Sequence, residues 1–94
     1  MPKTISQADS QAIAIQALTY IAADGEQMKR FVALSGIALE ELRLAAQEQG
    51  FLVGVLDFFM GHEPTLMAFA ANAGISPEDV TMARHRLAGE PGFE

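Results

Sequence analysis

The chain lacks cysteine and tryptophan, and its eight glycines stand singly among 94 residues. Without cysteine it forms neither a disulfide nor a thiolate metal site, which fits a cytoplasmic protein. Singly placed glycines build no glycine-rich loop for phosphate. The longest apolar run, residues 51–60, is interrupted by Asp57 and is about half the roughly 20 residues of a membrane span. The N-terminal segment has no apolar core of the kind that a secretory signal needs.

Basic residues are also scarce, with 6 lysines and arginines against 12 acids and a net charge of -6. An acidic surface repels phosphate backbones and anionic lipids, so the charge argues against nucleic acid and membrane as partners. Half of the residues are apolar, and the abundance of Ala, Leu, Gln, Glu and Met favours helix over strand. The length suits one domain with a single core.

The spacing of apolar residues predicts an all-α fold, a compact single-domain bundle of six short helices over residues 9–88. Residues 1–8 are expected to be disordered, and residues 89–94 to form a C-terminal tail. Asp9 or Ser10 is the expected cap of the first helix. The helix over 51–60 is apolar almost all round, which places it at the centre of the bundle. The six helices are expected over 9–23, 26–35, 39–49, 51–60, 65–73 and 77–88, the last with Ser76 as its cap and Pro77 at its first position.

The two halves of the sequence resemble each other. FVALSGIALEELRLA, residues 31–45, aligns without gaps with FAANAGISPEDVTMA, residues 69–83, at an offset of 38 residues. Both segments share a Gly-Ile corner followed by acids, a pattern that ends one helix and begins another. Helices one to three and four to six are therefore predicted to be two copies of a three-helix unit. The alternative is chance similarity between amphipathic helices.

Leu44 and Met82 take equivalent positions at this offset, each on the outward side of its predicted helix. They either pack the two halves together, which we favour, or form an exposed apolar patch with the neighbouring Gln47 and His85. In the second case the patch would bind a partner protein or a second copy of the chain, as in a homodimer.

The segment over residues 70–87 also has the outline of a helix-turn-helix, in which Arg84 and Arg86 would contact phosphates. A recognition helix presents its N-terminal outer face to the bases. Here that face carries Glu78 and Asp79, which phosphates repel. A nucleic-acid-associated regulator is therefore the alternative to an interaction protein.

Groups for catalysis or metal binding are few. His62 and Glu63 are adjacent, so they do not share a helix face, and a solvated loop accounts for them. Asp57 is either the polar edge of its apolar helix or hydrogen-bonded to the N-terminus of another helix. The sequence thus predicts no catalytic, cofactor-binding or metal-binding residue and no enzyme.

Three blocks occur in order along the chain: RFVALSG at 30–36, FLVGVLDF at 51–58 and FAANAGI at 69–75. On these blocks the chain resembles a family of short, acidic, uncharacterised proteobacterial proteins known as a domain of unknown function. The resemblance implies a cytoplasmic bacterial helical protein and brings no activity, cofactor or catalytic residue. Taken with the residue patterns, it leaves a small non-enzymatic protein-protein interaction or adaptor domain as the main hypothesis.

Overall fold

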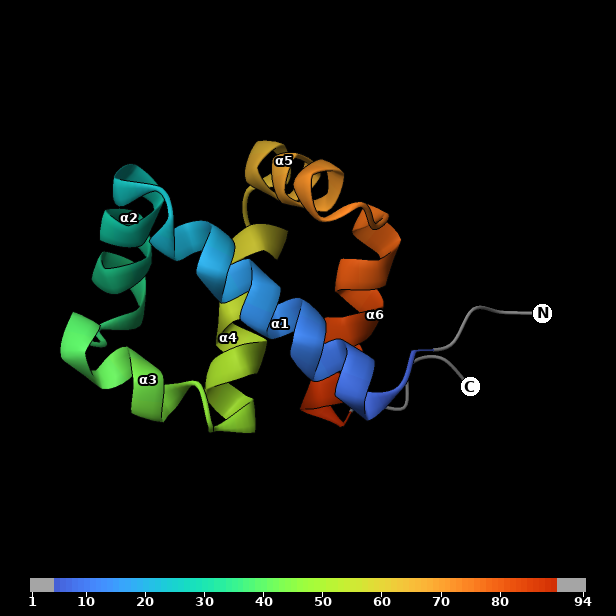
Figure 1. Cartoon of the computed structure of the whole chain (residues 1–94), viewed down its shortest axis with the longest axis horizontal. Coiled ribbons are helices and arrows are strands. Elements are labelled where there is room, and N and C mark those ends of the chain that lie inside the picture. Colours follow the sequence, from blue (N-terminus) through green and yellow to red (C-terminus); the bar gives the residue numbers. More distant parts are fainter. Residues whose placement is uncertain (1–4, 90–94) are drawn as a thin grey trace.

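The computed structural model describes residues 5–89, and every element within them is helical (Figure 1). The all-α prediction with six helices in one compact unit is confirmed. In the described part of the chain, no helix combines the length and the apolar character that crossing a membrane requires. The elements are α1 (Gln7–Ala22), α2 (Gly25–Ser35), a 3-10 turn η1 (Leu39–Glu41), α3 (Leu42–Ala45), α4 (Gln49–Met60), α5 (Glu63–Ala73) and α6 (Pro77–Ala88).

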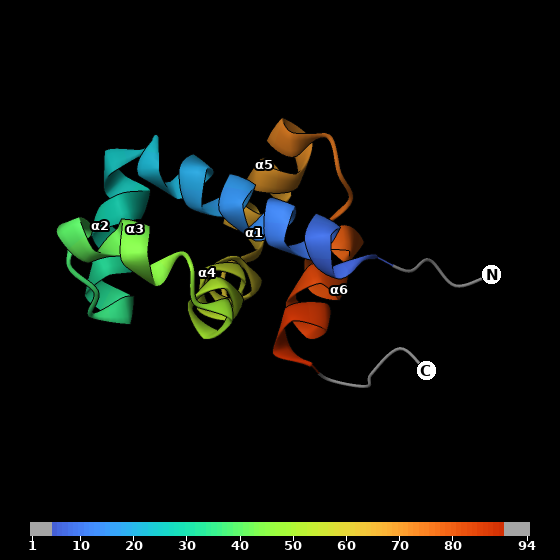
Figure 2. The same ribbon diagram turned by 60° about the horizontal axis from the view of Figure 1, so that its bottom comes forward.

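The core lies where α1, α4 and α6 meet. α1 runs across α4 and α6 in both views and packs against each of them, and α4 packs against α6 (Figures 1 and 2). α1 presents apolar residues at spacings of three and four, which places them on one face of the helix. The buried apolar residues of these three helices are Ile13, Ala14, Ala17 and Ile21 of α1, Leu52, Val55, Leu56, Phe58 and Phe59 of α4, and Val80, Met82, Ala83 and Leu87 of α6.

Aromatic rings join α2 and α5 to α4. The Phe69 ring of α5 lies 4.9 Å from the Phe59 ring, measured between centroids. On the other side of α4, the Phe31 ring of α2 meets the edges of Phe58 and Phe51 at 5.5 and 5.7 Å. Contacts of this kind add directional attraction to the burial of apolar surface, so they fix how α2 and α5 sit on α4.

The first helix begins earlier than the sequence predicts. The Ser6 hydroxyl oxygen accepts the backbone N–H of Asp9 at 3.0 Å, so Ser6 is the cap and α1 starts at Gln7. The prediction of Asp9 or Ser10 as the cap is wrong, because the Ser10 hydroxyl instead donates to the Ser6 carbonyl. α1 thus includes residues 7 and 8 of the segment expected to be disordered, and the expected domain bounds stay predictions. Residues 1–4 of that segment, and 90–94 of the expected tail, lie outside the described residues.

The third predicted helix is much shorter than expected. In place of a helix over 39–49, the structure has the three-residue turn η1 and the four-residue α3. Glu48 takes up extended backbone and turns the chain into α4, which starts at Gln49 instead of residue 51. Gly50 therefore lies in the first turn of α4 and does not break a helix. The residues of this stretch favour helix individually, which led to the prediction of a longer helix. Tertiary packing overrides such propensities.

Two other boundaries also move. Asp24, expected to end the first helix, caps the second, because its carboxylate accepts the N–H groups of Glu26 and Gln27 at 3.0 and 3.4 Å. α5 begins at Glu63 and not at residue 65, with Pro64 in the first turn, where it needs no N–H.

The Gly-Ile corners form as the sequence predicts, but they lead into different elements. Gly36 and Gly74 both end their helices with left-handed backbone, at φ of 73° and 72°. After Gly74, a reciprocal capping box between Ser76 and Asp79 begins the 12-residue α6. After Gly36 come only η1 and α3. The duplication of a three-helix unit itself stays a prediction.

A chain of amides ties three helices together at one end of the molecule. The Gln7 side-chain amide donates to the Gln49 side-chain oxygen at 2.6 Å, and the Gln49 amide donates in turn to the Leu87 carbonyl. The chain links the start of α1, the start of α4 and the end of α6. Nothing in the sequence pattern indicates it, because glutamine is common on solvent-facing helix surfaces.

Candidate functional site

The structure separates the four residues predicted to form one contact surface. Leu44 on α3 is 73% exposed, and Gln47 is exposed in the turn after α3. Met82 on α6 is only 5% exposed and belongs to the core, which agrees with the favoured alternative of packing for this residue and removes it from the exposed patch of the other alternative. His85, also on α6, is partly buried. α3 and α6 lie on opposite sides of the molecule in both views (Figures 1 and 2).

Leu44 instead lines a hollow that shares Ile37 with a hollow lined by Leu34, a residue that no sequence pattern singled out. Leu34 lies in the last turn of α2 and is 72% exposed. Between the two, Ile37 of the Gly-Ile corner lines two adjoining hollows. We call these three residues and the two hollows the α2–α3 face. A hydrophobic side chain in the last turn of a helix is an ambiguous signal, because the sequence does not say whether another element covers it.

The first hollow of the α2–α3 face is a groove between α2 and α4 with a volume of about 420 Å³. Its walls are largely apolar, and its charged neighbours are mixed in sign. Asp57 lines it, and the Arg30 guanidinium lies 4.9 Å from the centroid of the Phe58 ring at its side. The other lining residues are Phe31, Leu34, Ser35, Ile37, Phe51 and Gly54.

The second hollow lies along η1 and α3 and has a volume of about 430 Å³. Leu44, Ile37 and Ala45 give it an apolar floor, and none of its lining residues is basic. Three exposed carboxylates complete the lining, from Glu40, Glu41 and Glu48. One Glu41 oxygen accepts the backbone N–H of Ala38 at 3.1 Å, which orients that side chain. The hollow therefore combines exposed aliphatic surface with negative charge.

The helices of this face bury few residues. α2 buries only Phe31, and its main packing partner is α1. α3 has no buried residue, and its partly buried Leu42 packs against the core. The isoleucines of the two corners are both partly buried: Ile75 packs against the core, and Ile37 lines the two hollows.

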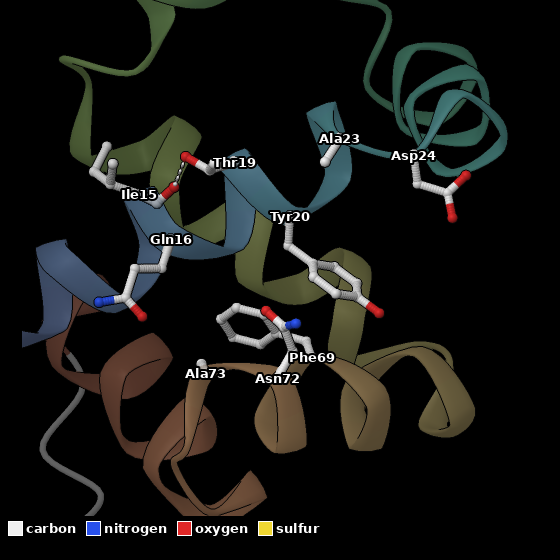
Figure 3. Close-up of a pocket in the computed structure, with 9 residues that line it drawn as sticks. All are labelled: Ile15, Gln16, Thr19, Tyr20, Ala23, Asp24, Phe69, Asn72 and Ala73. Atoms are coloured by element: carbon white, nitrogen blue, oxygen red, sulfur yellow. Dashed lines mark hydrogen bonds between the residues drawn. The ribbon is translucent and has the colours of Figure 1, made fainter.

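A third hollow lies between α1 and α5 and has a volume of about 600 Å³. Figure 3 shows the Tyr20 and Phe69 rings next to each other in its lining, with their centroids 5.5 Å apart in an edge contact, and the Asn72 amide beside them. The Thr19 hydroxyl donates to the Ile15 carbonyl at 3.0 Å. Asp24 already caps α2. None of the lining residues is a histidine, cysteine or lysine, so this groove holds no acid paired with a base.

The arginines of the nucleic-acid alternative lie in different surroundings. Arg84 Nε donates to Asp57 Oδ1 at 2.8 Å, whereas Arg86 is exposed. Asp79, expected on the outer face of α6, is instead largely buried and accepts the Ser76 backbone N–H. Glu78 is exposed in the first turn of α6.

The Asp57–Arg84 pair also decides between the two interpretations of Asp57. Its side chain is exposed and forms the polar edge of α4, and its partner is a side chain of α6 and not the N-terminus of a helix. The pair links α4 to α6 on the surface, where an ion pair contributes about 0–1 kcal/mol.

His62 and Glu63 lie at the start of α5. His62 Nδ1 is 2.6 Å from the Thr65 hydroxyl, and Glu63 is the first residue of the helix. Among residues 5–89, no three histidine, aspartate or glutamate side chains come together so that they could hold a metal ion.

Comparison with known proteins gives one match. A family model described as "Protein of unknown function (DUF3572)" matches residues 7–90, which is most of the chain. No curated protein and no solved structure shows a significant match.

Proposed function

We propose that this chain, which belongs to the family of proteins of unknown function DUF3572, is a small non-enzymatic domain that binds another protein through its α2–α3 face. The observation that carries the proposal is the exposure of Leu34 and Leu44 on either side of Ile37. Single exposed leucines are ordinary, but an apolar patch over adjoining hollows is typical of a binding surface.

The energetics of such a face suit a binding role. Covering an exposed leucine side chain completely is worth about 1.5–3 kcal/mol. A partner that covers both Leu34 and Leu44 therefore offsets a good part of the free energy that association costs in translational and rotational freedom. The phenylalanine rings beneath the α2–α4 groove give the surface a firm floor, because they pack edge to face.

The proposal favours a different protein over a second copy of the chain. A symmetric dimer through this face would bring the same patch of both copies together. Glu40, Glu41 and Glu48 of one copy would then face those of the other, and like charges in a partly desolvated contact repel. A cytoplasmic location, consistent with the lack of cysteine, is part of the proposal.

The test is a comparison of proteins retained from cells of the natural host by three forms of the chain, quantified by mass spectrometry. The face variant is Leu34→Ser with Leu44→Ser. Its matched control is Ile15→Ser with Met67→Ser, which removes two exposed apolar side chains on α1 and α5. We expect a protein that the wild type and the control retain alike and that the face variant loses at least about tenfold. If no retained protein depends on Leu34 and Leu44, the proposal is wrong.

The nucleic-acid alternative gains no support from Arg84, which is paired with Asp57. We expect no binding of a random DNA duplex in a fluorescence-anisotropy titration, even at low salt. Saturable binding that weakens steeply as salt rises would contradict this and favour the alternative, because release of counterions from phosphates gives that dependence.

A further inference from the structure

We call the second hollow, along η1 and α3, the α3 hollow. Its charge restricts which kind of partner can cover it. Glu40, Glu41 and Glu48 stand beside Leu44 and Ile37, and all three carboxylates are exposed. Arg43 lies on α3 but does not line the hollow. Carboxylates around an apolar depression attract cations and repel anions. A complementary partner therefore brings aliphatic side chains together with lysine or arginine.

The molecule itself indicates the shape of the partner. At the offset of 38 residues, Ile37 corresponds to Ile75 and Leu44 to Met82. The isoleucines of both corners are partly buried, but Met82 is buried whereas Leu44 is exposed. The elements against which α6 packs are helices, principally α1 and α4. The first corner has the same sequence pattern with Leu44 exposed, so a helix is the element that fits it.

The length of the face also suits a helix. The α2–α4 groove and the α3 hollow adjoin at Ile37, with Leu34 beside one and Leu44 beside the other. An amphipathic helix presents anchors at positions i, i+3 or i+4, and i+7, which can enter successive hollows of one groove. Its polar side would then reach the carboxylates at the rim.

We infer that the α2–α3 face is a docking site for an amphipathic helix of another protein that carries lysine or arginine beside its apolar stripe. The inference rests on the proposed function and adds the shape and charge of the partner. It also disfavours α6 of a second copy, although that helix carries Arg84 and Arg86, because α6 buries its apolar face in its own core.

The direct probe is a labelled 18-residue peptide of leucine and lysine, with the leucines on one face of the helix. One control peptide replaces each lysine with glutamate, and another keeps the composition but scatters the leucines around the helix. Binding to the full chain is followed by fluorescence anisotropy. We expect the cationic amphipathic peptide to bind at least about tenfold more tightly than either control, and less tightly as salt rises, because salt screens exposed charges.

Variants of the protein show where the peptide binds and distinguish the contribution of charge from that of apolar contact. Leu34→Ser with Leu44→Ser should weaken peptide binding at least about tenfold. Changing the three carboxylates at the rim of the α3 hollow to glutamine should weaken it by at least the same factor. Glutamine keeps an acceptor for the Ala38 N–H. A matched triple variant with the same change in net charge should leave binding within about twofold of the wild type. The rim variant is Glu40→Gln, Glu41→Gln and Glu48→Gln, and its control is Glu26→Gln, Glu63→Gln and Glu78→Gln, at exposed acids elsewhere.

Circular dichroism of each variant checks that it is folded. Equal binding of the three peptides, no binding of any peptide, or equal effects of the two triple variants would each overturn the inference. So would peptide binding that depends on Ile15 and Met67 in place of Leu34 and Leu44. The retained-protein experiment still decides the proposed function separately, because it makes no assumption about the charge or shape of the partner.

Sedimentation at several protein concentrations tests whether a second copy of the chain covers the α2–α3 face instead. A dimer that disappears with Leu34→Ser and Leu44→Ser would overturn the inference in favour of self-association. A monomer over the whole range supports it.

Discussion

Leu44 and Met82 stand at matching positions of two similar segments, and only the second is buried. The difference arises from what surrounds each residue, because both side chains are apolar and of similar size. α6 lies against α1 and α4 and buries Val80, Met82, Ala83 and Leu87, whereas the short α3 buries no residue and reaches the core only through its partly buried Leu42. At the scale of a residue, the sequence predicts which side chains can be buried, and the tertiary structure decides which are.

This contrast predicts the stability of two variants. Met82→Ala should lower the free energy of unfolding by about 2–5 kcal/mol, because it opens a cavity in the core. Leu44→Ala should change it by no more than about 0.5 kcal/mol, as surface substitutions do. Urea denaturation followed by circular dichroism measures both. A large loss for Leu44→Ala would mean that Leu44 is covered in solution.

The ion pair of Asp57 with Arg84 should contribute little. Both side chains reach solvent, so we expect a coupling free energy below about 1 kcal/mol. A double-mutant cycle with Asp57→Ala and Arg84→Ala isolates the pair from the other contacts of each residue. Coupling of several kcal/mol would contradict this expectation.

At the scale of an element, the two corners show where local signals suffice. Ser76, Pro77 and Asp79 begin α6 as their sequence indicates, because capping depends on a few adjacent residues. No comparable signal marks the end of α3 after Ala45. The next residues are compatible with helix, and the chain turns at Glu48 to bring α4 into the core.

The cap of α6 can be tested alone. Ser76→Ala removes the acceptor for the Asp79 N–H and should cost about 1 kcal/mol. For a domain of this size, that corresponds to a melting temperature lower by about 4–8 °C. Ser76→Asp supplies another side-chain acceptor and should keep most of the stability. Equal melting temperatures for Ser76→Ala and the wild type would show that the capping box is dispensable.

At the scale of the whole molecule, the sequence predicted the helical class and most helices, because apolar periodicity and caps are local. It favoured packing for Leu44, which is exposed, and did not indicate that Leu34 and the rim carboxylates lie near it. The α2–α3 face depends on α2 and α3 coming together beside α4, which no local pattern reveals. For the same reason it could not reveal that Met82 is buried while Leu44 is exposed.

Uneven packing predicts uneven stability along the chain. Amide hydrogens of η1 and α3 should exchange much faster than those of α1, α4 and α6, because α3 has no buried residue. Hydrogen exchange read by mass spectrometry or NMR measures this. The cationic peptide should slow exchange in α3 if it docks there. Protection in the free protein as high in α3 as in α4 would contradict the loose packing of the α2–α3 face.

The amide chain from Gln7 through Gln49 to Leu87 has a consequence for chain connectivity. It holds the first turn of α1 and the last turn of α6 around one side chain of α4. A short linker could therefore join the two ends, and the chain could be reopened in the exposed corner at Gly36. A circular permutant of this kind would keep α1, α4 and α6 together while freeing α3 from one of its two covalent connections.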